Sequence, residues 1–504
     1  MRQLTSTDSA FVYLEGEGKH NHLTGVYIYD PSTATGGKIR FKEILQHVSS
    51  RIHRSPVFRQ KLVRVPFNAD YPYWVDDENF DIEFHVRHIA LPQPGNWRQF
   101  CILIARLHSR PLDLARPVWE MTIVEGLDDI EGLPPGCFAM VIKYHHAAID
   151  GATGIELLGA LHDLSPKTAA VRDNSPWQPQ SVPSGADLLG RAALHNVRNP
   201  FRLTRSIISA TVPALSQRLL KREQREPVNP DPVPDTRFNR RVSPHRAFEG
   251  RSFALSEIRA IKNAVPGTTV NDVVLAICSG ALRHYLEAKK ELPEHSLVAA
   301  VPISTRPEGD TTPGNQLTAM MCPLQSQVAD PLARLTAISA ATHQAKETAN
   351  AVGARQMTDI QQHIPSSTLA LAGRLVNGLA LGVHTRFCNC VVTNVPGPQQ
   401  PLYLKGARLL SSWGCGPVID GVGLLILATS YDGKMFLSAS SCREIMPDPD
   451  LFSRCLQQSF DELHATVAEP SGSSRKKPRG APKRAQAKKK TATRSRGKRR
   501  AARS

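Results

Sequence analysis

The sequence has no run of about 18 or more uninterrupted apolar residues, the length that a helix needs to cross a bilayer. The closest candidate, TLALAGRLVNGLALGV, is interrupted by Arg374 and Asn377. This excludes the class of proteins anchored by an apolar transmembrane helix. We therefore expect any contact with lipid to be peripheral.

Cysteine is sparse and shows no paired arrangement. Nine cysteines are scattered through apolar segments, and an odd number in a long chain does not indicate a disulfide framework. Cys388 and Cys390 form a C-x-C pair without a second pair nearby, so alternating strand residues explain them better than a metal site. Because the chain starts without a signal peptide, we expect reduced thiols in a cytosolic protein.

Acidic and large apolar residues are both missing from the last thirty-four positions, Ser471–Ser504, which carry fifteen Lys or Arg. The rest of the chain has 47 basic and 45 acidic residues, so the net charge of +17 belongs to this tail. Such a segment cannot bury enough surface to fold alone, and we expect it to be disordered. It would bind anionic lipid, polyphosphate or DNA, without base-specific recognition because it lacks aromatic residues.

What is present is enough apolar sequence for two domains. A chain of 504 residues exceeds what one core usually organises, and 41% hydrophobic residues can fill two. Strand-like and helix-like segments alternate along it, which predicts an α/β fold. The strand-like segments are 25–30, 80–91, 119–127, 137–146, 297–304, 317–324, 388–397, 421–433 and 434–440, and the helix-like ones 97–110, 152–164, 269–289 and 333–350.

A connector separates the two predicted domains. We expect domains at 1–180 and 248–468, a connector at 181–247 and the disordered tail at 469–504. Within the connector, Ala186–Arg222 combines apolar and basic residues without an acid after Asp187. This composition is typical of a helix on an anionic membrane surface, but also of a helix packed on its own protein with a solvated basic face. Pro200 and Pro213 interrupt the pattern and favour the second interpretation.

The stretch YHHAAIDGATG, Tyr144–Gly154, carries the clearest chemical signal. H-x-x-x-D-G is expected by chance ~0.05 times in such a chain, and the doubled histidine lowers this to ~0.002. It follows a buried strand-like run and precedes a helix-like one, a position that suits a catalytic side chain. We interpret His146 as a general base, Asp150 as a residue that orients it or holds the loop, and Gly151 as permitting a backbone conformation that a β-carbon would oppose.

Other chemistries fit this stretch less well. Adjacent histidines on a strand point to opposite faces, so a metal site is disfavoured. Satisfied core histidines would explain one histidine but not the pair followed by Asp-Gly. No G-x-S-x-G motif is present, so a covalent serine mechanism has no support. The simplest remaining chemistry is direct transfer, in which an alcohol, thiol or amine attacks an activated carbonyl.

HHAAIDG resembles the HHxxxDG signature of the coenzyme A-dependent acyltransferase superfamily. Further segments are similar to motifs of the bacterial wax ester synthase/diacylglycerol acyltransferase family, and the similarity extends from about residue 4 to about residue 465. They are PLDLARPVWE (Pro111–Glu120), TVNDVVLA with Asn271 and Asp272, VTNVPGP (Val392–Pro398), SYDG (Ser430–Gly433) and the opening TSTDSAFVYLEGEGKHNHLTGVYIYD.

The resemblance implies two chloramphenicol-acetyltransferase-like halves joined by a helical connector, with the active site in a channel between them. His146 would be the base, His145 an accessory and Asp150 largely structural. Supporting residues of the site would be Gly151, Asn271, Asp272, Pro111, Asp113, Arg116 and Glu120. A plainer interpretation of the upstream motif is that Asp113 caps a turn and Arg116 pairs with Glu120. An ion pair between Arg306 and Asp150 is also expected.

Two features depart from the family pattern. Many relatives have an aspartate where this chain has SASSC (Ser438–Cys442), so details of that edge can differ. The basic tail is not part of the pattern.

The function implied by the resemblance is O-acyl transfer from acyl-CoA to a long-chain alcohol, a diacylglycerol or both, without a cofactor or metal. The expected location is cytoplasmic, at the surface of the inner membrane or of lipid inclusions. One alternative is an acyltransferase that takes its donor from a carrier protein in polyketide or peptide assembly. A non-enzymatic alternative is a granule- or nucleic-acid-associated protein that acts through its tail.

Overall fold

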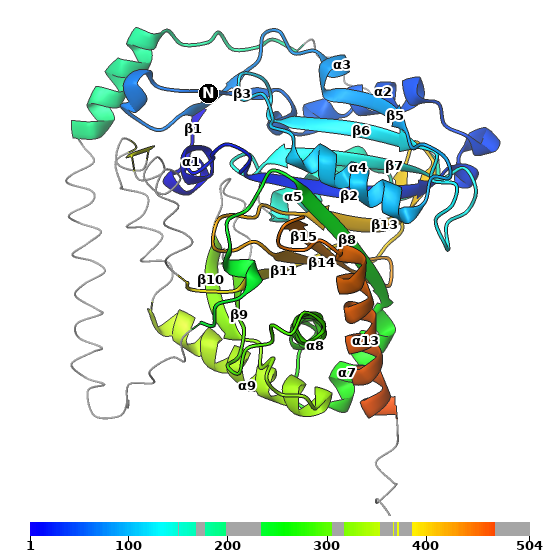
Figure 1. Cartoon of the computed structure of the whole chain (residues 1–504). Helices are drawn as coiled ribbons and strands as arrows, with labels where there is room; N and C mark the ends of the chain where they lie inside the picture. Colours follow the sequence, from blue (N-terminus) through cyan, green and yellow to red (C-terminus); the bar gives the residue numbers. More distant parts are fainter. Residues whose placement is uncertain are drawn as a thin grey trace, which may run out of the picture. The chain divides into compact units, whose positions relative to one another are not determined.

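The computed structural model describes residues 1–149, 151–167, 177–197, 233–304, 317–352, 366, 370–371 and 386–468 (Figure 1). The described residues up to Val467 belong to one compact unit. The predictions for Asp150, Arg306, residues 198–232 of the connector and the basic tail lie outside the described residues. In the described part of the chain, no helix is both long and apolar enough to span a membrane.

The sheet that carries the histidine pair has six strands. Its central strand β7 (Phe138–His145) is buried along its whole length, because its run of apolar residues faces a core on both sides. β7 is antiparallel to β2 (His22–Asp30) and β6 (Trp119–Glu125), with His145 opposite His22 and Tyr144 opposite Trp119. In spatial order the strands are β12 (Tyr403–Leu404), β13 (Ala407–Cys415), β2 (His22–Asp30), β7 (Phe138–His145), β6 (Trp119–Glu125) and β5 (Val86–Ala90).

The second six-stranded sheet belongs to the C-terminal half. Its apolar face packs with α7 (Leu255–Ala264), α8 (Val270–Ala288), α9 (Pro331–Val352) and α13 (Pro449–Ala468) to form one continuous core (Figure 1). The order of its strands is β10 (Leu317–Pro323), β9 (Val298–Ser304), β11 (Cys390–Pro396), β14 (Leu425–Tyr431), β15 (Lys434–Cys442) and β8 (Arg246–Ala254).

The two sequence halves exchange strands. β12 and β13 lie within the predicted C-terminal domain, yet β13 pairs with β2 and completes the N-terminal sheet (Figure 1). β13 also faces the second sheet, where Trp413 packs edge-on against Phe436 of β15 with ring centroids 4.8 Å apart. Ser438, in the segment that departs from the family pattern, donates a 2.7 Å hydrogen bond to the Gly414 carbonyl. The mixed α/β fold is as predicted, but the halves are not independent stretches of sequence.

The remaining described elements surround the N-terminal sheet. Helix α4 contacts both β2 and β8, and Trp97 at its start donates a hydrogen bond to Glu249 of β8 at 2.5 Å. These elements are α1 (Ser6–Tyr13), α2 (Phe41–Ser49), α3 (Ile82–His85), α4 (Trp97–Ser109), α5 (Gly151–Leu161) and a small sheet of β1 (Arg2–Gln3), β4 (Tyr73–Asp76) and β3 (Gln60–Val63).

One strand prediction is wrong over part of its length. Residues 80–91 were expected to be extended, but the Asp81 side chain accepts a hydrogen bond from the Glu83 amide and starts the one-turn helix α3. The strand begins only at Val86. A local cap therefore overrides the alternating pattern.

Among the described residues of the connector, 185–197 form a helix, and 233–247 include a 3-10 helix at Arg237–Asn239 and the first residues of β8. Leu188 and Ala192 are buried against Tyr73 and Val75, and His195 pairs with Asp70 at 2.8 Å. This helix packs on its own protein, which agrees with the interpretation favoured over a helix on a membrane surface.

The nine buried cysteines are all free, which agrees with the expectation of reduced thiols.

Candidate active site

The histidine pair lies where β7 ends. His145 is the last residue of the strand and His146 opens a turn that continues to Ala148, before α5 begins at Gly151. The His145 amide donates to the Val118 carbonyl at 3.0 Å, and the His146 amide donates to the Asn21 carbonyl at 2.8 Å. Backbone hydrogen bonds from both sides therefore fix the start of this turn.

The His145 ring is buried, with 1% of the side chain exposed. The Ala147 amide donates a 3.0 Å hydrogen bond to Nδ1, so Nδ1 accepts and the proton of the neutral ring is on Nε2. Nε2 faces Glu15 Oε1 at 3.3 Å. Because Nε2 has no hydrogen bond of standard geometry among the described residues, the interaction with Glu15 is mainly electrostatic.

Glu15 is held in its charged form. Burial alone would raise the pKa of its carboxyl, but the facing His145 ring and a 2.8 Å hydrogen bond from the Asn21 amide hold this pKa below its usual value. The carboxylate favours the His145 tautomer with a proton on Nε2. Glu15 therefore orients the His145 ring.

The His146 ring is half-buried and lies flat on Phe11 of α1, with ring centroids 4.0 Å apart and an angle of 9° between the planes. Asn21 links the two segments, since its side-chain amide donates to the Phe11 carbonyl at 2.7 Å while its own carbonyl holds the His146 amide. The opening segment of the chain thus covers one face of the His146 ring and leaves the side chain partly accessible.

The upstream motif leads into β6 beside the histidine strand. Glu120 contacts Arg87 at 3.2 Å and the buried Lys143 ammonium at 3.4 Å. Lys143 also donates to the carbonyls of Leu107 and Arg110, at 3.0 and 2.8 Å. Burial lowers the pKa of Lys143, although Glu120 opposes this effect. Glu120 therefore stabilises the buried Lys143 ammonium, two residues before His145 in β7.

The expected ion pair between Arg116 and Glu120 is wrong. Arg116 instead faces Asp113 at 3.5 Å and covers the ring of Phe84 at 3.9 Å. The residues between them are extended rather than helical, so a spacing of four does not bring the side chains together. Asp113 does cap a turn, because its carboxylate accepts from the Ala115 amide at 2.9 Å. Pro111 is exposed at the start of this segment.

Asn271 and Asp272 lie at the first turn of α8. Asp272 is fully buried and forms a reciprocal cap with Thr269, whose hydroxyl accepts from the Asp272 amide at 3.2 Å. Its other carboxylate oxygen accepts from Thr342 of α9 at 2.7 Å. These contacts join α8 to α9 and give Asp272 a structural role. Asn271 is half-buried at the second position of the helix.

Three further histidines surround His145 on the side of β2. The ring centroids of His22 and His145 are 6.1 Å apart, those of His22 and His108 6.5 Å, and those of His20 and His22 5.2 Å. Burial lowers the pKa of His22 strongly and that of His108 to about 3. It also lowers the pKa of the half-buried His20. These imidazoles are therefore neutral near pH 7.

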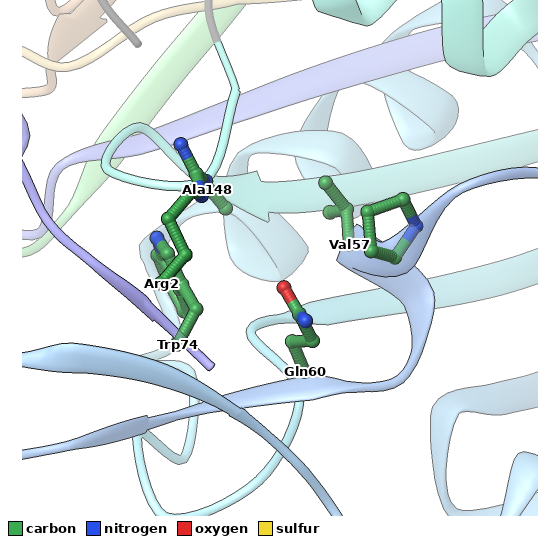
Figure 2. A pocket seen from close by; sticks show the side chains of 6 residues that line it. Arg2, Val57, Gln60, Trp74 and Ala148 are labelled. Carbon is green, nitrogen blue, oxygen red and sulfur yellow. The ribbon is translucent and has the colours of Figure 1, made fainter. Parts of the chain in front are cut away.

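A small pocket with a cavity volume of about 20 Å³ reaches the histidine turn through Ala148 (Figure 2). Pockets for drug-sized ligands have roughly 300–1,000 Å³, so this one is too small to enclose a long acyl chain. The predicted channel between the two halves stays a prediction. The pocket is lined by Arg2, Pro56, Val57, Gln60, Trp74 and Ala148.

The structure thus places Glu120 on the strand beside β7, which ends at His145 next to His146. The hydrogen bonds of Asp272 to Thr269 and Thr342 lie within the C-terminal half. Phe11, Glu15 and Asn21 were not singled out from the sequence, although they lie in the opening segment that resembles the family's start. Glu15 is 130 positions from its partner, so no local spacing could have revealed the contact.

Two family models match the chain. That of the wax ester synthase/diacylglycerol acyltransferase catalytic domain matches residues 4–274, and that of the WS/DGAT C-terminal domain matches residues 313–464. A relative from Mycobacterium tuberculosis, named as a diacylglycerol O-acyltransferase, is 34% identical over 483 residues and covers 94% of this chain and 92% of its own length. The O-acyltransferase WSD of Acinetobacter baylyi is 33% identical over 482 residues, or 93% of this chain and 98% of its own.

Solved structures agree with this similarity. The wax ester synthase/diacylglycerol acyltransferase of Marinobacter aquaeolei has a TM-score of 0.64 and 27% identity, and the match covers 93% of this chain and all of that one. The first condensation domain of the calcium-dependent antibiotic synthetase has a TM-score of 0.54 over 94% of this chain and 98% of its own. At 14% identity, the latter shows a shared fold alone.

Proposed function

Because the chain belongs to the wax ester synthase/diacylglycerol acyltransferase family, we propose that it transfers a long-chain acyl group from acyl-CoA to the hydroxyl of a fatty alcohol or a diacylglycerol, with His146 as the general base. The observation that carries this proposal is the contrast between the two histidines. His145 is buried, with Nδ1 occupied by an amide and Nε2 facing Glu15, whereas His146 is partly accessible at the end of a rigid strand.

The proposed reaction needs one proton acceptor and no covalent enzyme intermediate. His146 takes the proton of the acceptor hydroxyl while the oxygen attacks the thioester carbonyl carbon. The tetrahedral intermediate collapses when the carbon–sulfur bond breaks. The imidazolium then returns its proton to the CoA thiolate, so ester and free CoA leave a neutral His146. Acyl-CoA is a substrate in this scheme, and no cofactor takes part.

The fixed surroundings of His146 support this role. Stacking on Phe11 restricts the ring, and the hydrogen bond from the His146 amide to the Asn21 carbonyl restricts the backbone, before substrate binds. Restricting a catalytic side chain in this way lowers the entropy cost of reaching the reactive geometry. His145 is itself oriented by Glu15, and its Nδ1 accepts a hydrogen bond from the Ala147 amide in the turn that carries His146.

The test is an assay of free CoA release from palmitoyl-CoA with hexadecanol or dioleoylglycerol. His146→Ala should lower kcat by about 10²–10⁴-fold, the usual contribution of a general base. His88→Ala, which removes an exposed histidine of β5, is the matched control and should keep wild-type activity. Equal rates for the two variants would refute the assignment of His146.

The ratio of wax ester to triacylglycerol formed in this assay identifies the preferred acceptor. Wild-type protein that releases no CoA with either acceptor, but transfers an acyl group from a carrier-bound thioester, would move the function to polyketide or peptide assembly. The likeness to a condensation domain shows only the fold and does not favour that outcome.

We further propose that the basic tail, Ser471–Ser504, tethers the enzyme to an anionic surface such as a lipid membrane or lipid inclusion. The support is its fifteen Lys or Arg without an acid, beside a remainder of the chain that is close to neutral. Each basic residue near an anionic membrane contributes about 1 kcal/mol. Polyphosphate and DNA are also negatively charged, so binding to each is measured separately from binding to vesicles.

A further inference from the structure

We propose that Glu15, His20 and His22 form a site for a zinc-like divalent cation, and that an ion bound there inhibits acyl transfer by withdrawing Glu15 from His145. One ligand atom from each of the three side chains lies within 4.8 Å of the other two. The site adjoins His145 but shares no residue with the HHxxxDG motif.

The donor set fits a borderline-soft cation. Two imidazoles and one carboxylate suit zinc, whereas magnesium and calcium prefer oxygen ligands alone. In a tetrahedral zinc site the ligand atoms lie roughly 3.3 Å apart. His20 Nδ1 is 4.0 Å from Glu15 Oε1, so small side-chain rotations would close the site. His20 and His22 are two residues apart at the start of β2, which puts their rings side by side with an angle of 14° between the planes.

The second nitrogen of His22 has a partner of the kind that metal-binding histidines use. His22 Nδ1 is 3.5 Å from the His108 carbonyl, a long contact in which the ring donates its proton and leaves Nε2 with a lone pair. A histidine ligand commonly donates its other N–H to a backbone carbonyl, which fixes the ring. His108 is fixed in turn between Thr24, at 2.8 Å, and the Gly416 carbonyl, at 3.2 Å.

The protonation states also agree with metal binding near neutral pH. Burial lowers the pKa of both His20 and His22, and the charge of Lys143 lowers these pKa values further. The pKa of Glu15 is below its usual value. The three ligands are therefore present without protons that a metal would have to displace. Arg246 and Lys143 oppose a bound cation, so we expect zinc to bind more weakly here than at a closed structural zinc site.

Inhibition follows from two contacts that Glu15 makes near the histidine pair. Its carboxylate now faces His145 and accepts from the Asn21 amide, and Asn21 in turn holds the backbone of His146. A cation that binds Glu15 would compete with both contacts. The effect on activity rests on the proposed function, whereas the site itself does not.

The binding test uses the full chain, freed of metal with a chelator, and ZnCl₂ in isothermal titration calorimetry. His20→Phe keeps a flat ring next to His22 but removes the ligand nitrogen, and His88→Phe is the matched control. We expect His20→Phe to weaken zinc binding at least about tenfold, and His88→Phe to leave it unchanged. His20→Asn, with a smaller side chain, provides a second variant in case the phenylalanine disturbs the fold. Equal zinc affinity in wild type and both His20 variants would overturn the site.

The activity test compares the same proteins with and without zinc. Wild type should lose most of its CoA release as zinc rises through its Kd, while His20→Phe should stay active and magnesium should have no effect. Zinc inhibition of equal strength in wild type and His20→Phe would overturn the link to Glu15. If the chain transfers no acyl group at all, the calorimetric comparison still decides whether the site exists.

Discussion

Glu15 Oε1 lies 3.3 Å from His145 Nε2, across 130 positions of sequence. The contact joins the segment after α1 to the end of the central strand β7. On the other side of the ring, the Ala147 amide occupies Nδ1. The His145 ring is thus defined in orientation and tautomer before any substrate arrives.

This relationship predicts the effect of Glu15→Gln and Glu15→Ala on catalysis. Loss of the carboxylate should let the His145 ring shift and the neighbouring turn loosen, and a displacement of about 1 Å near a reacting group costs about 10²-fold in rate. We expect kcat to fall by about that factor in Glu15→Ala and less in Glu15→Gln, which can still accept from the Asn21 amide.

Glu17→Gln is the matched control for these variants, because Glu17 is exposed two residues away. Its kcat should equal that of wild type. A Glu15→Ala enzyme with normal kcat and an unchanged pH profile would show that the carboxylate does not position His145.

Substitutions in the Asn271-Asp272 pair should show a structural role for Asp272 and a functional role for Asn271. Asp272→Ala removes a helix cap and the buried carboxylate that accepts hydrogen bonds from Thr269 and Thr342, so we expect a loss of about 2–4 kcal/mol in the free energy of unfolding. Asn271→Ala should change this free energy by less than about 0.5 kcal/mol. Urea denaturation followed by fluorescence gives both values.

Activity distinguishes the two residues further. If Asn271 supports the site, Asn271→Ala should lower CoA release while its stability stays near that of wild type. Normal activity of the stable variant would remove Asn271 from the proposed site.

Stability should fall as the pH drops below about 6.5, before most carboxylates protonate. Burial lowers the pKa of His47 and His162 to about 4 and that of His108 to about 3, so these rings stay neutral in the folded protein where the unfolded chain binds protons. Because the unfolded state binds more protons, each histidine lowers the free energy of unfolding by up to about 1.4 kcal/mol per pH unit. The three together give about 4 kcal/mol per unit at most.

The check is urea denaturation between pH 7 and pH 5 of wild type and His47→Gln. The glutamine can still donate to the Leu161 carbonyl, which now accepts from His47 at 2.8 Å. It does not titrate, so the slope should fall by up to about 1.4 kcal/mol per pH unit. The exposed His88, changed to glutamine, should leave the slope as in wild type; a slope that is the same in all three proteins would contradict the prediction.

Deletion of Ser471–Ser504 should weaken co-sedimentation with phosphatidylserine vesicles by more than about tenfold at low salt, since several basic residues each contribute about 1 kcal/mol. Acyl transfer to a detergent-dispersed acceptor should be unchanged. Neutral phosphatidylcholine vesicles are the control. Binding to anionic vesicles that survives the deletion would refute the tether, and binding to DNA or polyphosphate alone would identify a different partner.

Local sequence predicted the elements whose signals are local. The apolar run of β7 and the helix predicted over 269–289 appear where expected, and Thr269 caps α8. Asp113 caps its turn through an amide two residues away. In each case the interaction that decides the structure lies within a few residues, so spacing and composition contain it.

The features that were missed depend on distant residues. Arg116 and Glu120 were paired by a spacing that is valid only on a helix, whereas β6 places Glu120 opposite Lys143 of the next strand. Glu15 meets His145 only because β2 and β7 are neighbours in the sheet. A single sequence shows neither relationship, because register between strands is set by the whole sheet.

The pairing of β13 with β2 has a consequence for synthesis of the chain. β2 ends at Asp30, and its partner β13 begins at Ala407. At about 5–20 residues per second, a ribosome needs roughly 20–75 seconds to make the intervening chain. During that time one edge of β2 has no strand to pair with, and an open edge is a place where other chains can add. A nascent chain of this protein is therefore expected to depend on chaperones until β13 emerges, and a fragment that ends at the catalytic-domain boundary near residue 274 is expected to aggregate.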